Sequence, residues 1–185
     1  MLEELYKNTK AKMQKTVELL AQEFSRLRTA RANPAILDGV KVAYYGSTVP
    51  LKQIASISIP DPRQIVIQPW DRNAIGEIEK AIYKADIGLT PQVETNLIRI
   101  PIPLLTEERR KELVKLCAKL AEDSKVAIRN IRREGNDQVK KLEKDKKISE
   151  DESKNGTKKV QDITDELIKN IDDLFARKEK EVLEK

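Results

Sequence analysis

The chain has 185 residues and a formal net charge of +5, with no histidine and a single cysteine. These counts exclude histidine general bases, Ser-His and Cys-His nucleophile pairs, histidine metal sites and an internal disulfide. Charged residues make up 36% of the chain and hydrophobic residues 39%, a balance that favours long helices with one buried stripe over a thick globular core.

Residues 1–30 are predicted to form a long amphipathic helix. Apolar or small side chains recur at spacings of three and four residues, which places them on one face of a helix. These side chains are Leu2, Leu5, Thr9, Met13, Val17, Leu20, Phe24 and Leu27. The first residues lack the apolar segment of a secretion signal, and no apolar run approaches the length of a membrane span. We therefore expect a cytoplasmic protein with no membrane segment.

Residues 31–105 differ in composition and are predicted to form an inserted domain. They hold all eight prolines of the chain. Short runs rich in β-branched residues predict strands, and helical spacing of isoleucines predicts a helix within 73–85. The predicted strands lie within 39–46, 53–59, 64–70 and 96–103. Strands around a single helix favour a small α+β or barrel-like sandwich domain.

The chain crosses twice between this domain and the flanking helices, near residues 29–32 and 103–106. Prolines beside both crossings restrict the backbone. Two crossings together predict a hinge that can swing without wandering freely. The predicted hinge residues are Thr29, Ala30, Arg31, Pro103, Leu104, Leu105 and Thr106.

Residues 106–185 are predicted to form two more long helices. Thr106 caps the first of them, and Ser149 with Glu152 forms a capping box at the start of the second. The predicted buried stripe of the first is Leu113, Cys117, Leu120, Ser124, Ala127, Ile131, Gln138 and Leu142. That of the second is Val160, Ile163, Leu167, Ile171, Leu174 and Val182. Residues 1–30 and 106–185 thus predict a three-helix bundle, with Cys117 as a small core side chain rather than a reactive thiol.

Gly135 and Gly156 lie inside these two predicted helices, where a glycine costs about 1 kcal/mol relative to alanine. The Asn155-Gly156 pair is also a turn signal, so we expect its helix to be locally loose. Gly135 borders the predicted stripe, so it is either a weak point or a place where a neighbouring helix comes close.

The excess positive charge lies on the helix that begins at Thr106. Residues 106–147 carry 14 basic and 9 acidic side chains, and residues 148–185 carry 8 basic and 11 acidic ones. With Ser124 taken as the direction of the core, one group of polar side chains falls between roughly 80° and 180° away. We call this group the basic strip. It consists of Lys125, Arg129, Arg132, Arg133, Asn136 and Lys140.

The basic strip is either an ordinary solvated face or a surface for a polyanion. Its three arginines fall within five positions, and the flat guanidinium fork suits phosphate oxygens. Few aromatic side chains are expected at the surface, which favours structured RNA read through its backbone over stacked single strands. The chain has no phosphate-binding glycine loop and no cysteine cluster, so we expect no enzyme activity, metal or cofactor.

Several stretches, in matching order and spacing along the whole chain, resemble the ribosome recycling factor family. They include RLRTARANPAILDGVKVAYYG, IPDPRQIVIQPWDRNAIGEIEKAI, ADIGLTP, RIPIPLLTEERRKELVK, VAIRNIRRE and SEDE. The resemblance implies an L-shaped α+β protein, in which an elongated three-helix bundle carries an inserted β/α/β sandwich domain. It also implies a factor that binds the post-termination ribosome and, with elongation factor G and GTP, separates its subunits.

The resemblance also implies which residues contact large-subunit ribosomal RNA, because the contacting arginines of the family match Arg129 and Arg132. The candidates are Lys125, Arg129, Arg132 and Arg133 on the helix, with Arg28 and Arg31 at the first crossing. Elongation factor G would act on domain 31–105, and the protein would work as a monomer.

One departure from the family lies at a crossing. Ala30 stands where the family usually has glycine, and this exchange is expected to stiffen the first crossing. Two other functions stay open from the residues alone. One is a ribosome-binding anti-association factor that needs no elongation factor G, and the other is a helical adaptor protein.

Overall fold

The computed structural model describes residues 1–184 and divides into two compact units. The first, which we call the bundle unit, comprises Met1–Phe24 and Lys111–Lys180. The second, the α/β unit, comprises Ser25–Arg110 together with the C-terminal residues from Glu181 onward. Within residues 1–184 no helix has both the length and the apolar character of a membrane span.

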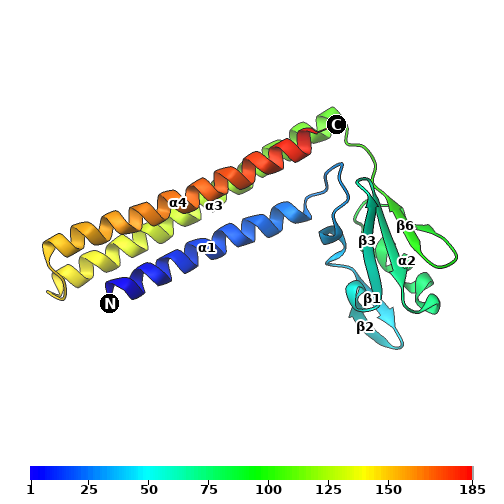
Figure 1. Cartoon of the computed structure of the whole chain (residues 1–185), viewed down its shortest axis with the longest axis horizontal. Coiled ribbons are helices and arrows are strands. Elements are labelled where there is room, and N and C mark those ends of the chain that lie inside the picture. Colours follow the sequence, from blue (N-terminus) through cyan, green and yellow to red (C-terminus); the bar gives the residue numbers. More distant parts are fainter. Residues whose placement is uncertain (185) are drawn as a thin grey trace. The chain divides into compact units, whose positions relative to one another are not determined.

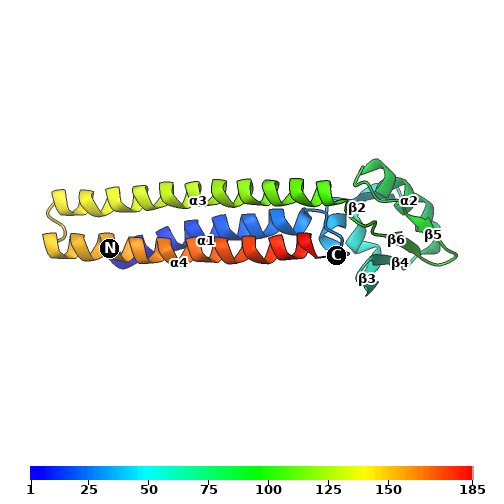
Figure 2. The same cartoon turned by 90° about the horizontal axis from the view of Figure 1, so that it is seen from above.

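Most of the length of three long helices makes up the bundle unit: α1 (Leu2–Arg26), α3 (Glu107–Lys144) and α4 (Glu150–Leu183). They run alongside one another, with α3 antiparallel to the other two (Figures 1 and 2). Ion pairs cross all three interfaces, namely Lys10 with Glu166, Lys12 with Glu134 and Lys125 with Asp172. At 1.5 Å per residue α3 is about 57 Å long, and the predicted three-helix bundle is confirmed.

The starts of α3 and α4 use the predicted capping residues. Thr106 Oγ1 accepts a hydrogen bond of 3.2 Å from the backbone N–H of Arg109. At α4, Ser149 Oγ accepts from the Glu152 N–H at 3.2 Å, while Glu152 Oε2 accepts from the Ser149 N–H at 2.7 Å. Backbone and hydroxyl donors of Ser149 hold the pKa of the Glu152 carboxyl below its ordinary value.

The buried stripe of α1 follows the prediction, but that of α3 does not. On α3 the buried residues are Leu113, Cys117, Ala121, Ile128, Gly135 and Val139. Ser124 and Ile131, predicted to face the core, are only half-buried, and Gln138 is exposed. The reason is that α3 faces two neighbours at once. Its most buried positions therefore lie between the two seams, and half-buried residues flank them on both sides.

Both helical glycines lie where helices come close. A Cβ added at Gly135 would meet Thr9 Oγ1 of α1 and Val160 Cγ1 of α4, each at 3.4 Å. One added at Gly156 would meet the Tyr6 hydroxyl and Val139 Cγ1 at 3.2 Å. Gly135 therefore lies at a helix contact, as one of its two predictions has it, but a Cβ would fit there at ordinary contact distance. The loose segment predicted at Asn155-Gly156 is wrong, because α4 is continuous there.

The α/β unit contains two antiparallel sheets and one helix, α2 (Ile75–Lys84). The small sheet pairs β1 (Lys41–Tyr44) with β2 (Ser47–Pro50). The larger sheet has the order β3-β4-β6-β5. Its strands are β3 (Ala55–Asp61), β4 (Gln64–Pro69), β5 (Gln92–Val93) and β6 (Ile98–Pro101). The short helices η1 (Pro34–Leu37), η2 (Leu51–Gln53) and η3 (Arg72–Ala74) complete the unit.

Both sheets and α2 share one hydrophobic core. Val42 of β1, Ile67 of β4 and Ile78 of α2 are fully inaccessible to solvent and belong to the same cluster. The predicted α+β class and the helix at 73–85 are confirmed. The strands β2 and β5 were not predicted, because β2 is largely exposed and polar and β5 has only two residues.

Candidate nucleic-acid interface

The basic strip lies on α3, turned further towards the core than predicted. Lys125, Arg129 and Arg132 are half-buried, and only Arg133 and Lys140 are fully on the surface. This correction follows from the buried line of α3, which runs through residues such as Ala121 and Ile128 rather than through Ser124. The inner members of the strip consequently lie at the border between α3 and α4.

Side chains of α4 hold two members of the basic strip. Lys125 Nζ lies 2.5 Å from Asp172 Oδ1, and Arg132 Nη1 donates a hydrogen bond of 3.1 Å to Gln161 Oε1. Gln161 in turn donates to Asp165 Oδ1 at 2.8 Å. This chain of contacts fixes the direction of the Arg132 guanidinium. Sequence periodicity did not reveal it, since the partners come from a different helix.

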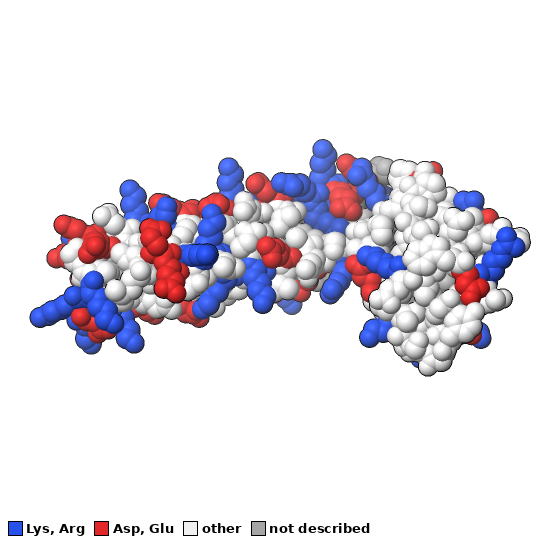
Figure 3. Space-filling model, turned by 60° about the horizontal axis from the view of Figure 1, so that its bottom comes forward, with Lys and Arg blue, Asp and Glu red and all other residues white. Residues whose placement is uncertain are grey.

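The other two arginines differ in their partners. Arg129 is paired with Glu122, which precedes it by two turns on α3. Within residues 1–184 no carboxylate pairs with Arg133, whose side chain is exposed. Figure 3 shows lysine and arginine side chains along one face of the bundle unit, with acidic side chains among them. The face of the α/β unit in the same view carries few charges.

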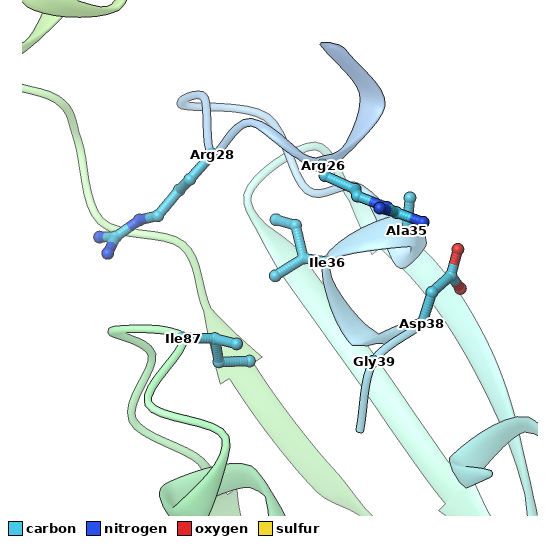
Figure 4. A pocket seen from close by; sticks show the side chains of 7 residues that line it. All are labelled: Arg26, Arg28, Ala35, Ile36, Asp38, Gly39 and Ile87. Atoms are coloured by element: carbon cyan, nitrogen blue, oxygen red, sulfur yellow. The ribbon is translucent and has the colours of Figure 1, made fainter. Parts of the chain in front are cut away.

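Arg28 and Arg31 belong to the α/β unit and form a separate group. Arg28 Nη1 donates a hydrogen bond of 3.0 Å to the carbonyl of Gly88, and Arg31 is paired with Glu184. Arg28 also lines a cavity of about 470 Å³. Figure 4 shows Arg26 at one side of this cavity and Arg28 at the other. Both predicted candidates are therefore already held by contacts within their own unit.

The predicted hinge residues differ strongly in burial. Thr29 and Ala30 are buried, and the Thr29 hydroxyl donates a hydrogen bond of 2.9 Å to Glu181 Oε1. Pro103 and Leu104 are exposed. The φ angle of Ala30 is not positive, so alanine adopts this backbone without strain.

Known proteins resemble this chain across both of its units. The family model described as "Ribosome recycling factor" matches residues 20–183. A "Ribosome-recycling factor" of Carboxydothermus hydrogenoformans is 53% identical over 183 residues, which is 99% of each chain. One from Bacillus subtilis is 53% identical over 184 residues and covers 100% of both chains.

Two solved structures that resemble this chain are also described as ribosome recycling factors. A solution structure of the ribosome recycling factor matches with a TM-score of 0.79 and 46% identity, covering 98% of this chain and 97% of that one. A second match is described as "Models for the T. thermophilus ribosome recycling factor and the E. coli elongation factor G bound to the E. coli post-termination complex". It has a TM-score of 0.69 and 51% identity, and covers 100% of both chains.

Proposed function

The chain belongs to the ribosome recycling factor family, and we propose that it binds the post-termination ribosome through large-subunit ribosomal RNA. With elongation factor G and GTP it would promote dissociation of the subunits, releasing mRNA and tRNA for a new round of translation. The observation that carries this proposal is the full-length match, because relatives with 53% identity cover both units and both crossings.

The basic strip would supply the RNA contact. A phosphate would replace Glu122 as the partner of Arg129 and Asp172 as the partner of Lys125. Both acidic partners are exposed, and ion pairs open to solvent contribute only about 0–1 kcal/mol, so this exchange costs little. Arg132 would keep its hydrogen bond to Gln161, so its guanidinium would be ordered before RNA arrives and would lose little side-chain entropy on binding.

The two crossings would supply the hinge. The first is tied down by the hydrogen bond between Thr29 and Glu181. The second has exposed residues at Pro103 and Leu104, so it is the freer of the two. Elongation factor G would push on the α/β unit while the bundle unit stays anchored, and Arg28 and Arg31 would add RNA contacts near the first crossing.

The proposed role needs no catalytic group in this chain, because the GTP would be hydrolysed by elongation factor G. The protein would act as a monomer in the cytoplasm, where it meets ribosomes. A helical adaptor would instead need a free apolar face on a helix. Each of the three helices already buries its stripe against the other two.

Sedimentation of post-termination ribosomes tests the proposal. With this protein, elongation factor G and GTP together, we expect 70S particles to separate into subunits. Leaving out either factor, or replacing GTP by a non-hydrolysable analogue, should leave most particles intact. Subunit separation by this protein alone would instead support an anti-association factor, and no separation under any condition would contradict the proposal.

A further inference from the structure

The hairpin between β1 and β2 places a large aromatic side chain in an unusual position. Tyr44 pairs with Ser47, which leaves Tyr45 and Gly46 as a two-residue loop with φ of +45° and +80°. Such loops favour Asn or Asp followed by Gly, because a left-handed backbone is costly for a bulky residue. Tyr45 is nevertheless 78% exposed, so burial does not account for it.

Asp71 holds Tyr45 in place. The Tyr45 hydroxyl donates a hydrogen bond of 2.8 Å to Asp71 Oδ2, and the Asn73 N–H donates to Asp71 Oδ1 at 2.9 Å. These donors keep the pKa of the Asp71 carboxyl below its ordinary value, with the Asn73 N–H as the larger cause. The ring of Tyr44 meets that of Tyr45 edge-on, with centroids 4.5 Å apart and planes at 75°. Two aromatic rings and an ionised carboxylate thus form a fixed corner.

This corner opens onto a cavity of about 190 Å³. The lining includes Tyr44, Tyr45, Asp71 and, from α2, Glu77. It contains two carboxylates and no lysine or arginine, although the chain as a whole carries a net charge of +5. Within residues 1–184 Glu77 is paired only with the exposed Lys80, at 3.3 Å, which leaves it available to another cation.

We propose that this cavity receives an arginine or lysine side chain of a protein partner. A cation is attracted to the negative face of an aromatic ring, and the two carboxylates add to that attraction. The same carboxylates repel phosphate, which disfavours RNA as the occupant. Trp70, which directly precedes Asp71, is 70% exposed, and exposed Trp and Tyr side chains are typical anchors of protein interfaces. The site shares no residue with the basic strip, so it extends the proposed function rather than depending on it.

Small peptides can test the cavity on the intact protein without ribosomes. The probes are acetyl-Gly-Arg-Gly-amide, acetyl-Gly-Lys-Gly-amide and the neutral citrulline analogue of the arginine peptide. Trp70 is the only tryptophan of the chain, so its fluorescence reports binding beside Asp71. The amide resonances of Tyr45 and Asn73 provide a second readout, and adenosine monophosphate serves as the nucleotide probe.

We expect the arginine or lysine peptide to give saturable shifts at Tyr45 and Asn73, and the citrulline peptide to bind at least about fivefold more weakly. Asp71→Asn keeps a side chain able to cap η3 and should weaken binding of the cationic peptide by a similar factor, as should Glu77→Gln. Glu79→Gln on the same helix removes a carboxylate outside the cavity and should change nothing. Equal binding of the citrulline peptide, unchanged binding by both cavity variants, or the same shifts with adenosine monophosphate would overturn the proposal.

Discussion

Arg132 and Arg133 are neighbours in sequence but differ in how far the fold orders them. Gln161 of α4 accepts a hydrogen bond from Arg132 and is itself held by Asp165. Arg133 is exposed, so its side chain would have to be ordered when RNA binds. A long charged side chain loses rotamer freedom when it is fixed, and this loss offsets part of the contact that Arg133 would make.

Arg132→Ala is therefore expected to weaken ribosome binding more than Arg133→Ala. Loss of an ordered guanidinium should raise the Kd about tenfold, equivalent to roughly 1.4 kcal/mol, and loss of Arg133 only about threefold. Cosedimentation with ribosomes measures both values. Arg177→Ala, an exposed arginine of α4 outside the basic strip, is the matched control. Wild-type binding by Arg132→Ala, with unchanged helicity and Tm, would remove Arg132 from the interface.

The stabilisation that Glu152 gives to the start of α4 depends on pH. Its pKa is below the ordinary value of 4.5 because the Ser149 backbone N–H and hydroxyl donate to the carboxylate. Since the folded-state pKa is lowered, the stabilisation is present above pH 4.5 and is lost as the pH falls through the lowered folded-state pKa. Urea unfolding of wild type and Glu152→Gln should show their largest difference near neutral pH. A difference that stays constant into the acid range would contradict this assignment.

At the scale of elements, the glycines of α3 and α4 serve the packing of the bundle unit. Glycine has a lower helix propensity than alanine, but its missing side chain lets neighbouring backbones approach. The space at the two positions is unequal. Gly135 has ordinary contact distances around the missing Cβ, whereas Gly156 lies closer to the fully buried side chain of Val139.

Gly135→Ala and Gly156→Ala are accordingly expected to have different effects on the free energy of unfolding. Gly135→Ala should raise the free energy of unfolding by about 0.5–1 kcal/mol, because the gain in helix propensity meets no tight contact. Gly156→Ala should give no gain or a loss, since Val139 would have to shift in a packed core. Equilibrium urea denaturation measures both variants. Equal stabilisation by the two substitutions would show that the space at Gly156 relaxes freely.

At the scale of the whole molecule, the segment that contains α3 has an excess of basic side chains and the segment that contains α4 an excess of acidic ones. Residues 106–147 hold 14 basic and 9 acidic side chains, while residues 148–185 hold 8 and 11. The strip of α3 therefore carries its excess charge beside an acidic helix, whose Asp172 pairs with Lys125. Binding to RNA would replace such internal partners with phosphates and release counterions from the RNA.

Ribosome binding should consequently weaken steeply with salt. Each neutralised phosphate is expected to contribute about 0.7–0.9 to the slope of log K against log salt concentration. Arg132→Ala should lower that slope by about one such step, whereas Arg177→Ala should leave it unchanged. Binding measured across a series of potassium chloride concentrations gives the slopes. A flat salt dependence would contradict a phosphate-based interface.

The three long helices, their capping residues and the inserted strand-rich segment were predictable from the sequence, because each depends on residues close together in the chain. Thr106 and Ser149 cap where their local patterns indicate, and the prolines of 31–105 distinguish that segment from the flanking helices. The resemblance to the family also follows from contiguous stretches. The basic strip could be identified by helical spacing alone, since its members are on one helix.

Tertiary packing alone decided how that strip is turned and what holds it. The spacing within α3 could not show that the helix faces two neighbours, so it could not place Arg132 beside Gln161. Nor could it show that Gly135 lies against both Thr9 of α1 and Val160 of α4. The corner that Tyr45 and Asp71 form joins residues 26 positions apart. Such contacts depend on how separate elements pack, and no local pattern in the sequence encodes that packing.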